Sequence, residues 1–334
     1  MNEDSILKGI RENEWIDWEG KASVYYWNYS FRKKNELNDL IRKVNPHTVF
    51  VNGLYSFYFN IMPVWYSIKK AHTSVVWSAR GMLHTGALAQ KAFKKRLFLS
   101  VIKLFGIHKK VVWHATDERE QKFIQQKMGA VRICIAGNYP NLLTHLPIHT
   151  KNRGELILGT IALISPMKNH KAVIEALQNC KGTIKWLIYG PVKDEQYWNS
   201  CLQLIRELPQ NIQVVYKGEL PPSQLSSAFN EIQVFIMPSE SENFGHAIIE
   251  ALSAGKPVIT TITTPFHGIG KVKAGIAVEL NELPKSLTQS INYFSAMAIE
   301  EYSSYSKAAV AFASSYISID ELTQRYQKLF QINA

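Results

Sequence analysis

The sequence predicts an α/β protein made of two doubly wound domains, each with a parallel sheet between layers of helices. Short apolar runs rich in Val and Ile recur along the chain, as strands that are buried on both faces require. Amphipathic helical stretches separate these runs, and this alternation is typical of parallel sheets. The length of 334 residues, 46% of them hydrophobic, suits two cores of ordinary size.

The apolar runs place the expected strands and helices. A helix over 171–177 would bring Val173, Ile174 and Leu177 onto one face, and a second helix is expected over 246–254. Strands are expected at 48–52, 74–78, 110–114 and 131–135 in the first half, and at 156–163, 185–189, 213–217, 233–237 and 257–261 in the second.

The polar segment 144–155 separates the two alternating regions, and we take it as the domain boundary. We therefore expect a first domain over 1–150 and a second, ligand-binding domain over 151–315. Residues 316–334 should form a helix that returns to the first domain.

The cysteines and the apolar segments indicate the cellular compartment in which the chain is expected. Cys134, Cys180 and Cys201 stand far apart and form no C-x-x-C pair, which argues against a disulfide framework and a zinc site. The opening Met-Asn-Glu-Asp is unlike a signal peptide, and the most apolar stretch, 97–107, is too short to span a bilayer. We expect a cytoplasmic chain, with peripheral contact to the inner membrane as an open alternative.

The net charge of +11 predicts an anionic partner. Between 91 and 110, basic residues interleave with apolar ones such as Phe93, Leu97 and Val101. Written as a helix, this segment is either a membrane-surface face or a solvated helix whose apolar side lies in the core. We expect no nucleic-acid partner, because no zinc finger, RRM signature or helix-turn-helix is apparent.

Function is expected in the strand-to-helix turns, because doubly wound sheets bind ligands beyond the carboxyl ends of their strands. The turn after 156–163 reads I-S-P-M-K-N-H over 164–170. Lys168 lies just before a helix start, where free backbone N–H groups and the helix dipole favour an anion such as a diphosphate. An exposed lysine beside an ordinary helix start is the alternative.

The turn after 233–237 reads P-S-E-S-E-N-F-G-H over 238–246. Gly245 allows a ligand to approach the backbone, and the N–H groups of 243–245 can serve oxygen atoms. The carboxylate of Glu242 suits sugar hydroxyls, because it accepts several hydrogen bonds. Glu250 follows in the next helix. The alternative is that Glu242 is an ordinary first-turn acid and Glu250 a surface residue.

The two turns together resemble a known family. The run P-S-E-S-E-N-F-G-H-A-I-I-E-A-L-S-A-G-K-P-V-I over 238–259 resembles the donor-site signature of the family-four retaining glycosyltransferases. I-S-P-M-K-N-H resembles their phosphate loop, and Y-G-P and Y-K-G-E-L, at 189–191 and 216–220, resemble their intermediate strand ends. The resemblance is strongest in the second half. It implies the GT-B fold, in which two Rossmann-like domains face a cleft.

The resemblance also implies roles for the residues of the second half. Glu242 would contact the donor sugar as a catalytic residue, Glu250 the nucleotide ribose, and Lys168 the diphosphate. The remaining donor-binding positions that it implies are Asn243, Phe244, Gly245, Gly190 and Gly218, the last beside the base.

In the first half, S-A-R-G-M-L (78–83) and H-A-T-D-E-R-E (114–120) resemble a bacterial subgroup associated with surface polysaccharides. Arg80 occupies the place where many relatives have a histidine near the sugar, which implies a second catalytic residue. Asn138 lies where relatives have an asparagine near the interdomain cleft, and it is expected to contact the donor.

The sequence departs from the family pattern at two places. Relatives usually carry an arginine five residues before the lysine, whereas Leu163 stands there and leaves the diphosphate one cation short. Relatives also begin with a strand and a glycine-rich loop, whereas this chain opens M-N-E-D-S-I-L-K-G-I. The first domain is therefore expected to be incomplete.

The resemblance thus implies a retaining, metal-independent hexosyltransferase of surface polysaccharide biosynthesis (O-antigen, capsule or lipopolysaccharide). It would move a sugar from a UDP- or GDP-linked donor to a glycan or lipid-linked glycan acceptor. No metal is expected because the chain has no D-x-D motif, and no cofactor is expected besides the donor substrate. Two alternatives stay open: a non-catalytic protein that binds a nucleotide sugar or a partner, and a sugar-nucleotide epimerase that converts donor alone.

Overall fold

The chain forms two compact units in the computed structural model, which describes residues 11–28, 36–83, 92–143 and 151–331. The first unit consists of Met1–Gly137 together with Gln324–Ala334, and the second unit is Asn138–Thr323. The segment 144–155, expected as the boundary, begins inside the second unit, and its residues 144–150 lie outside the described part. The opening residues 1–10, which carry the prediction of an incomplete first domain, also lie outside it.

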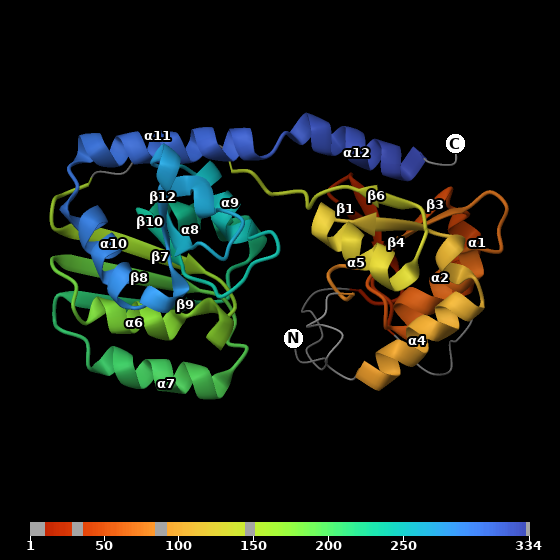
Figure 1. The fold of residues 1–334 in the computed structure, drawn as a ribbon, viewed down its shortest axis with the longest axis horizontal. Coiled ribbons are helices and arrows are strands. Elements are labelled where there is room, and N and C mark those ends of the chain that lie inside the picture. The colour runs from red at the N-terminus through yellow and green to blue at the C-terminus, as the bar shows by residue number, and fades with distance from the viewer. Residues whose placement is uncertain (1–10, 29–35, 84–91, 144–150, 332–334) are drawn as a thin grey trace. The chain divides into compact units, whose positions relative to one another are not determined.

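The second unit contains a six-stranded parallel sheet with the order β12-β11-β10-β7-β8-β9 (Figure 1). The chain starts in the middle of the sheet, builds outward from β7 to β9, and then restarts at β10 on the other side of β7. The order therefore reverses between β7 and β10. The strands are β7 (Glu155–Ile161), β8 (Thr183–Tyr189), β9 (Ile212–Gly218), β10 (Val234–Met237), β11 (Val258–Thr261) and β12 (Gly275–Val278).

Helices cover both faces of this sheet. Successive side chains of a strand point to opposite faces, and the apolar side chains on each face need a layer of helices to bury them. In β8, Trp186 and Ile188 pack into one core, while Leu187 and Tyr189 pack into another. Helices α6, α7 and α10 close the first core, α8 and α9 close the second, and α11 contributes to both. Their bounds are α6 (His170–Leu177), α7 (Glu195–Arg206), α8 (Leu225–Glu231), α9 (His246–Ser253), α10 (Lys285–Ala296) and α11 (Ile299–Tyr316).

The first unit has a four-stranded parallel sheet with the order β3-β4-β5-β6. Trp77 and Trp113, on its central strands, stack with their ring centroids 5.3 Å apart on the face that α2, α4 and α5 cover. Leu329 of α12 packs on the other face with Val76 and Val112. The elements are β3 (Thr48–Asn52), β4 (Ser74–Ser78), β5 (Val112–Ala115), β6 (Ile133–Ile135), α1 (Glu36–Val44), α2 (Met62–Ser67), α4 (Ala92–Leu104), α5 (Glu118–Met128) and α12 (Ile319–Gln331).

The strands expected from the sequence are confirmed, with shifts at their ends, and the parallel sheet of the first unit is smaller than that of the second. The sequence analysis missed an antiparallel hairpin, β1 (Trp15–Trp18) with β2 (Ala22–Tyr25), whose residues are largely exposed and give no buried apolar run. It also missed β12, which is short and begins with Gly275, packed against the backbone of Val258. None of the described helices combines the length and the apolar character needed to cross a bilayer.

The centre of β7 has room only for glycine, which makes a direct test of the packing possible. A Cβ atom at Gly159 would lie 2.1 Å from Cδ1 of Ile232. Gly159→Ala should therefore lower the free energy of unfolding by about 1–3 kcal/mol, through overpacking, in urea denaturation. Gly268→Ala is the control, because a Cβ there meets no atom within 4 Å. Equal stability of the two variants would contradict the close packing of β7.

Candidate functional site

The candidate site lies where the strand order of the second unit reverses. β7 and β10 are adjacent and parallel, with Leu158 opposite Val234 and Gly159 opposite Phe235. The loops that follow the two strands therefore leave the sheet at the same edge. In a doubly wound sheet, the crevice at such a switch point is where ligands bind.

Three contacts hold these two loops together. The side-chain amide of Asn169 donates to the carbonyl of Pro238 at 2.8 Å, and the N–H of Glu240 donates to the carbonyl of Met167 at 2.9 Å. The third contact is an ion pair between Lys168 and Glu242. The structure thus brings together two residues that lie far apart in the sequence and that the sequence analysis assigned to one site.

The ion pair between Lys168 and Glu242 is well shielded from solvent. The exposed fractions of the two side chains are 21% and 12%. The sequence alternatives, an exposed lysine and an ordinary first-turn acid, do not fit this arrangement. A diphosphate would compete with Glu242 for the ammonium, and sugar hydroxyls could then donate to the released carboxylate.

The start of α9 offers backbone donors beside this pair. Gly245 is the N-cap with a φ of 73°, in the left-handed region that favours glycine, and a Cβ there would lie 2.9 Å from Phe266. No side chain caps the helix. Among the described residues, no hydrogen bond uses the N–H groups of Asn243, Phe244 or Gly245. These groups can therefore donate to the oxygen atoms of a ligand.

Glu250, in the second turn of α9, is half-buried rather than a surface residue. Burial raises the pKa of its carboxyl to about 7. Within the described parts of the chain, no hydrogen bond or ion pair satisfies that carboxylate. Hydroxyl groups of a ligand could supply the missing donors, as the ribose role implied by the resemblance requires.

Gly190 follows β8 and Gly218 ends β9 at the same edge of the sheet, and their surroundings differ. The N–H of Gly190 donates to the carbonyl of Gly218 at 2.8 Å, and a Cβ at Gly190 would lie 2.0 Å from the carbonyl oxygen of Ala162. Gly190 is therefore required by backbone packing. A Cβ at Gly218 meets no atom within 4 Å, so that position has room for a ligand.

Arg80 belongs to the first unit, where it follows β4 at the carboxyl edge of that sheet. It has a φ of 47°, and its Nε donates to Oδ1 of Asn52 at 3.1 Å. The sequence analysis missed the residue that fixes this loop, Glu120, whose buried carboxylate accepts from the N–H of Gly81 at 2.6 Å and from that of Thr116 at 2.8 Å.

A signal for Glu120 was present in the sequence, because Asp117 and Glu120 have the spacing of a capping box at the start of α5. Asp117 does cap the N–H of Glu120 at 2.7 Å. The Glu120 carboxylate reaches back to Thr116, the residue before the cap, with one oxygen and to Gly81 of the neighbouring loop with the other. The spacing alone indicates a helix start and not this second role.

Two further residues from the sequence analysis lie in the second unit. Asn138 is its first residue and is half-buried. Leu163, in the loop after β7, has an exposed fraction of 44%, so the position where relatives carry arginine is open to solvent. Across the described residues, no three His, Cys, Asp or Glu side chains are grouped to hold a metal ion.

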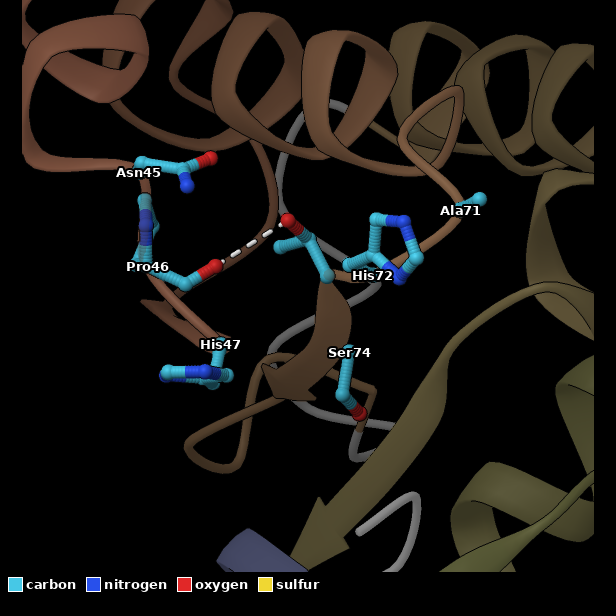
Figure 2. Close-up of a pocket in the computed structure, with 7 residues that line it drawn as sticks. Asn45, Pro46, His47, Ala71, His72 and Ser74 are labelled. Carbon is cyan, nitrogen blue, oxygen red and sulfur yellow. Dashed lines mark hydrogen bonds between the residues drawn. The ribbon is translucent and has the colours of Figure 1, made fainter.

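A pocket of about 480 Å³ lies elsewhere, in the first unit (Figure 2). It is lined by His47, His72 and their neighbours, and Thr73 donates to the carbonyl of Pro46 at 3.0 Å across it. These residues precede β3 and β4, so the pocket lies at the amino edge of the sheet, opposite the loop of Arg80. Because parallel sheets bind ligands at the carboxyl edge, we do not take it as the site.

The fold is that of the GT-B glycosyltransferases. Residues 144–311, half of the chain, match the family "Glycosyl transferases group 1". The chain belongs to that family. Its fold is similar to that of Anabaena HepE in complex with UDP and glucose, with a TM-score of 0.65 and 16% identity over 92% of this chain and 86% of that chain. It is also similar to WaaG, a glycosyltransferase involved in lipopolysaccharide biosynthesis, with a TM-score of 0.58 and 14% identity over 92% and 98% of the two chains.

Two curated relatives are similar in sequence. The sulfoquinovosyl transferase SQD2 of Arabidopsis thaliana is 26% identical over 66% of this chain and 37% of its own length. The 2-deoxystreptamine N-acetyl-D-glucosaminyltransferase of Niallia circulans is 28% identical over 51% of this chain and 45% of its own length. The chain thus matches less than half the length of each of these relatives.

The raised pKa of Glu250 predicts a pH dependence of stability. In the folded chain the carboxyl keeps its proton up to a pH of about 7, whereas in the unfolded chain it loses it near pH 4.3. The contribution of Glu250 to stability is therefore full below pH 4.3 and is lost as the pH rises to about 7. Glu250→Gln, neutral throughout, should have a higher melting temperature than the parent above pH 7, and the difference should vanish near pH 4.

The matched control is Glu219→Gln, since Glu219 is exposed and lies outside any helix; it should leave the melting temperature unchanged both above pH 7 and near pH 4. If the melting temperature of Glu250→Gln followed the parent at every pH, a carboxylate without a partner at this position would be ruled out.

Proposed function

We propose that this protein is a retaining glycosyltransferase that moves a hexose from a UDP-linked donor to a glycan acceptor in surface polysaccharide biosynthesis. Membership of the glycosyl transferases group 1 family supports the reaction class. The UDP and glucose bound to HepE support the donor, and the role of WaaG in lipopolysaccharide biosynthesis supports the acceptor class.

The observation that carries the proposal is the meeting of Lys168 and Glu242 at the switch point between β7 and β10. A transferase of this kind needs a cation where the diphosphate leaves and an acceptor of hydrogen bonds where the sugar sits. The two loops supply one of each, side by side.

The proposed chemistry follows from these groups. Negative charge develops on the diphosphate as the bond to the sugar breaks, and Lys168 with the N–H groups of 243–245 would stabilise it. Glu242 would hold the sugar hydroxyls and the positive charge that develops on the sugar ring. No step of this scheme requires a metal ion. Arg80, held beside Asn52 in the first unit, is proposed as a second group that acts on the sugar.

A second function, non-catalytic binding of a nucleotide sugar, is favoured by one observation. Leu163 is exposed and uncharged at the position where the resemblance implies an arginine, so the diphosphate has one cation fewer. Incubation with UDP-sugars and candidate acceptors separates the possibilities. Transfer supports the proposed enzyme, binding without transfer supports the second function, and conversion of donor alone identifies an epimerase.

Substitutions of the ion pair test the division of roles. Lys168→Ala should weaken UDP binding roughly ten- to a hundredfold in titration calorimetry, because a charge-assisted contact is worth about 1.5–3 kcal/mol. Glu242→Gln should keep or slightly raise the affinity for UDP, since Lys168 is released, but should abolish most of the transfer.

Lys181→Ala is the matched control for Lys168→Ala, because Lys181 is exposed and precedes β8 at the opposite edge of the same sheet. Unchanged UDP affinity in Lys168→Ala, or full transfer by Glu242→Gln, would disprove the assigned roles.

A gain-of-function variant tests the effect of Leu163. Leu163→Arg should tighten UDP binding by roughly up to fivefold, because an exposed charge pair is worth about 0.2–1 kcal/mol. Leu163→Gln, of similar size and without charge, is the control. If the arginine variant bound UDP no better than the glutamine variant, the diphosphate would not lie beside this loop.

A further inference from the structure

Helix α4 of the first unit is apolar on two opposite faces. Leu99 and Ile102 on its inner face are buried in the core. On the outer face, Phe93, Leu97, Val101 and Leu104 have exposed fractions of 80%, 57%, 41% and 82%. At the rotation of an α-helix, these four lie within about 80° of one another, roughly opposite the buried pair. The sequence alternative, a solvated helix whose apolar side lies in the core, accounts for Leu99 and Ile102 but not for these four exposed residues.

The exposed stripe continues beyond the end of α4. Phe105, directly after the helix, and Trp65 of α2 are both exposed and lie edge to face, with ring centroids 6.0 Å apart. The ammonium of Lys69 sits 4.6 Å from the Trp65 ring. Aromatic rings paired with lysines are characteristic of the boundary between water and lipid. We call Phe93, Leu97, Val101, Leu104, Phe105 and Trp65 the outer stripe.

Basic side chains border the stripe on both sides. On the helix, the exposed Lys94 falls on one flank, and the exposed Arg96 and Lys103 fall on the other. Helix α4 contains no Asp or Glu. Lys109 and Lys110, which follow it, are also exposed. An apolar band between two positive rows matches a surface that is negatively charged outside and apolar beneath.

We propose that the outer stripe docks the protein on an anionic lipid bilayer, with α4 lying in the plane of the interface. The apolar side chains would enter the boundary between headgroups and acyl chains, and the flanking basic residues would contact the phosphates. A second copy of the chain fits less well, because a symmetric contact through this face would bring the basic rows of two α4 helices together. This surface is independent of the donor site and goes beyond the proposed function.

Vesicle co-sedimentation of the full chain tests the proposal. The parent should bind vesicles of phosphatidylcholine mixed with phosphatidylglycerol, and bind pure phosphatidylcholine much less. Lys94→Gln with Arg96→Gln and Lys103→Gln should weaken binding to the anionic vesicles roughly fivefold per residue, about a hundredfold in all. Leu97→Gln with Leu104→Gln should also weaken binding to the anionic vesicles. The binding that remains should be more sensitive to salt than that of the parent, because it depends more on charge.

The matched control replaces exposed lysines of the second unit: Lys181→Gln with Lys285→Gln and Lys307→Gln. It removes the same charge and should bind as the parent does. A blue shift of tryptophan fluorescence on vesicle binding that Trp65→Phe reduces would place the stripe at the lipid. Circular dichroism melts of each variant establish that it folds.

Three results would overturn the proposal. The first is no preference of the parent for anionic vesicles. The second is equal loss in the α4 triple variant and in the control triple variant, which would indicate net charge alone. The third is a dimer in sedimentation equilibrium that Leu97→Gln with Leu104→Gln dissociates, which would assign the stripe to a second copy. Because the readout is lipid binding, none of these results depends on whether the chain transfers sugar.

Discussion

Adjacent placement of β7 and β10 is the constraint on which the candidate site depends. The two strands are separated by more of the chain than any other neighbouring pair of the second sheet, yet their hydrogen-bonded pairing brings the loops after them to one edge. The amide of Asn169 and the N–H of Glu240 then fix the distance between the loops. Lys168 and Glu242 meet because of this framework, and their attraction adds to it without creating it.

The fold was largely predictable because its strands are buried on both faces. A strand such as β8, with Trp186 on one side and Leu187 on the other, must be apolar throughout, so it stands out from the helices around it. The β1–β2 hairpin escaped detection for the opposite physical reason. Its side chains are largely exposed, so no burial pattern marks the sequence.

The site was predictable to the level of residues and motifs, but not of contacts. Sequence spacing placed Lys168 and Glu242 in turns, and only the strand order could make them neighbours. The burial of individual side chains near the site could not be predicted from the sequence either. His170 lies two residues after Lys168, but it is enclosed beside Trp186, and burial lowers its pKa to about 4. Lys168 therefore gains no second positive charge from this neighbour.

The return of α12 to the first unit has a consequence for the order of folding. Leu329 fills the face of the first sheet that carries Val76 and Val112, and Tyr326 donates to the carbonyl of Gly137 at 3.0 Å. During synthesis the ribosome makes this segment only after the whole second unit. The strands of the first unit are therefore made early but keep one apolar face uncovered while Asn138–Thr323 emerges. The second unit can complete its core before the unit that precedes it, and during that interval the nascent first sheet is the surface that chaperones would be expected to shield.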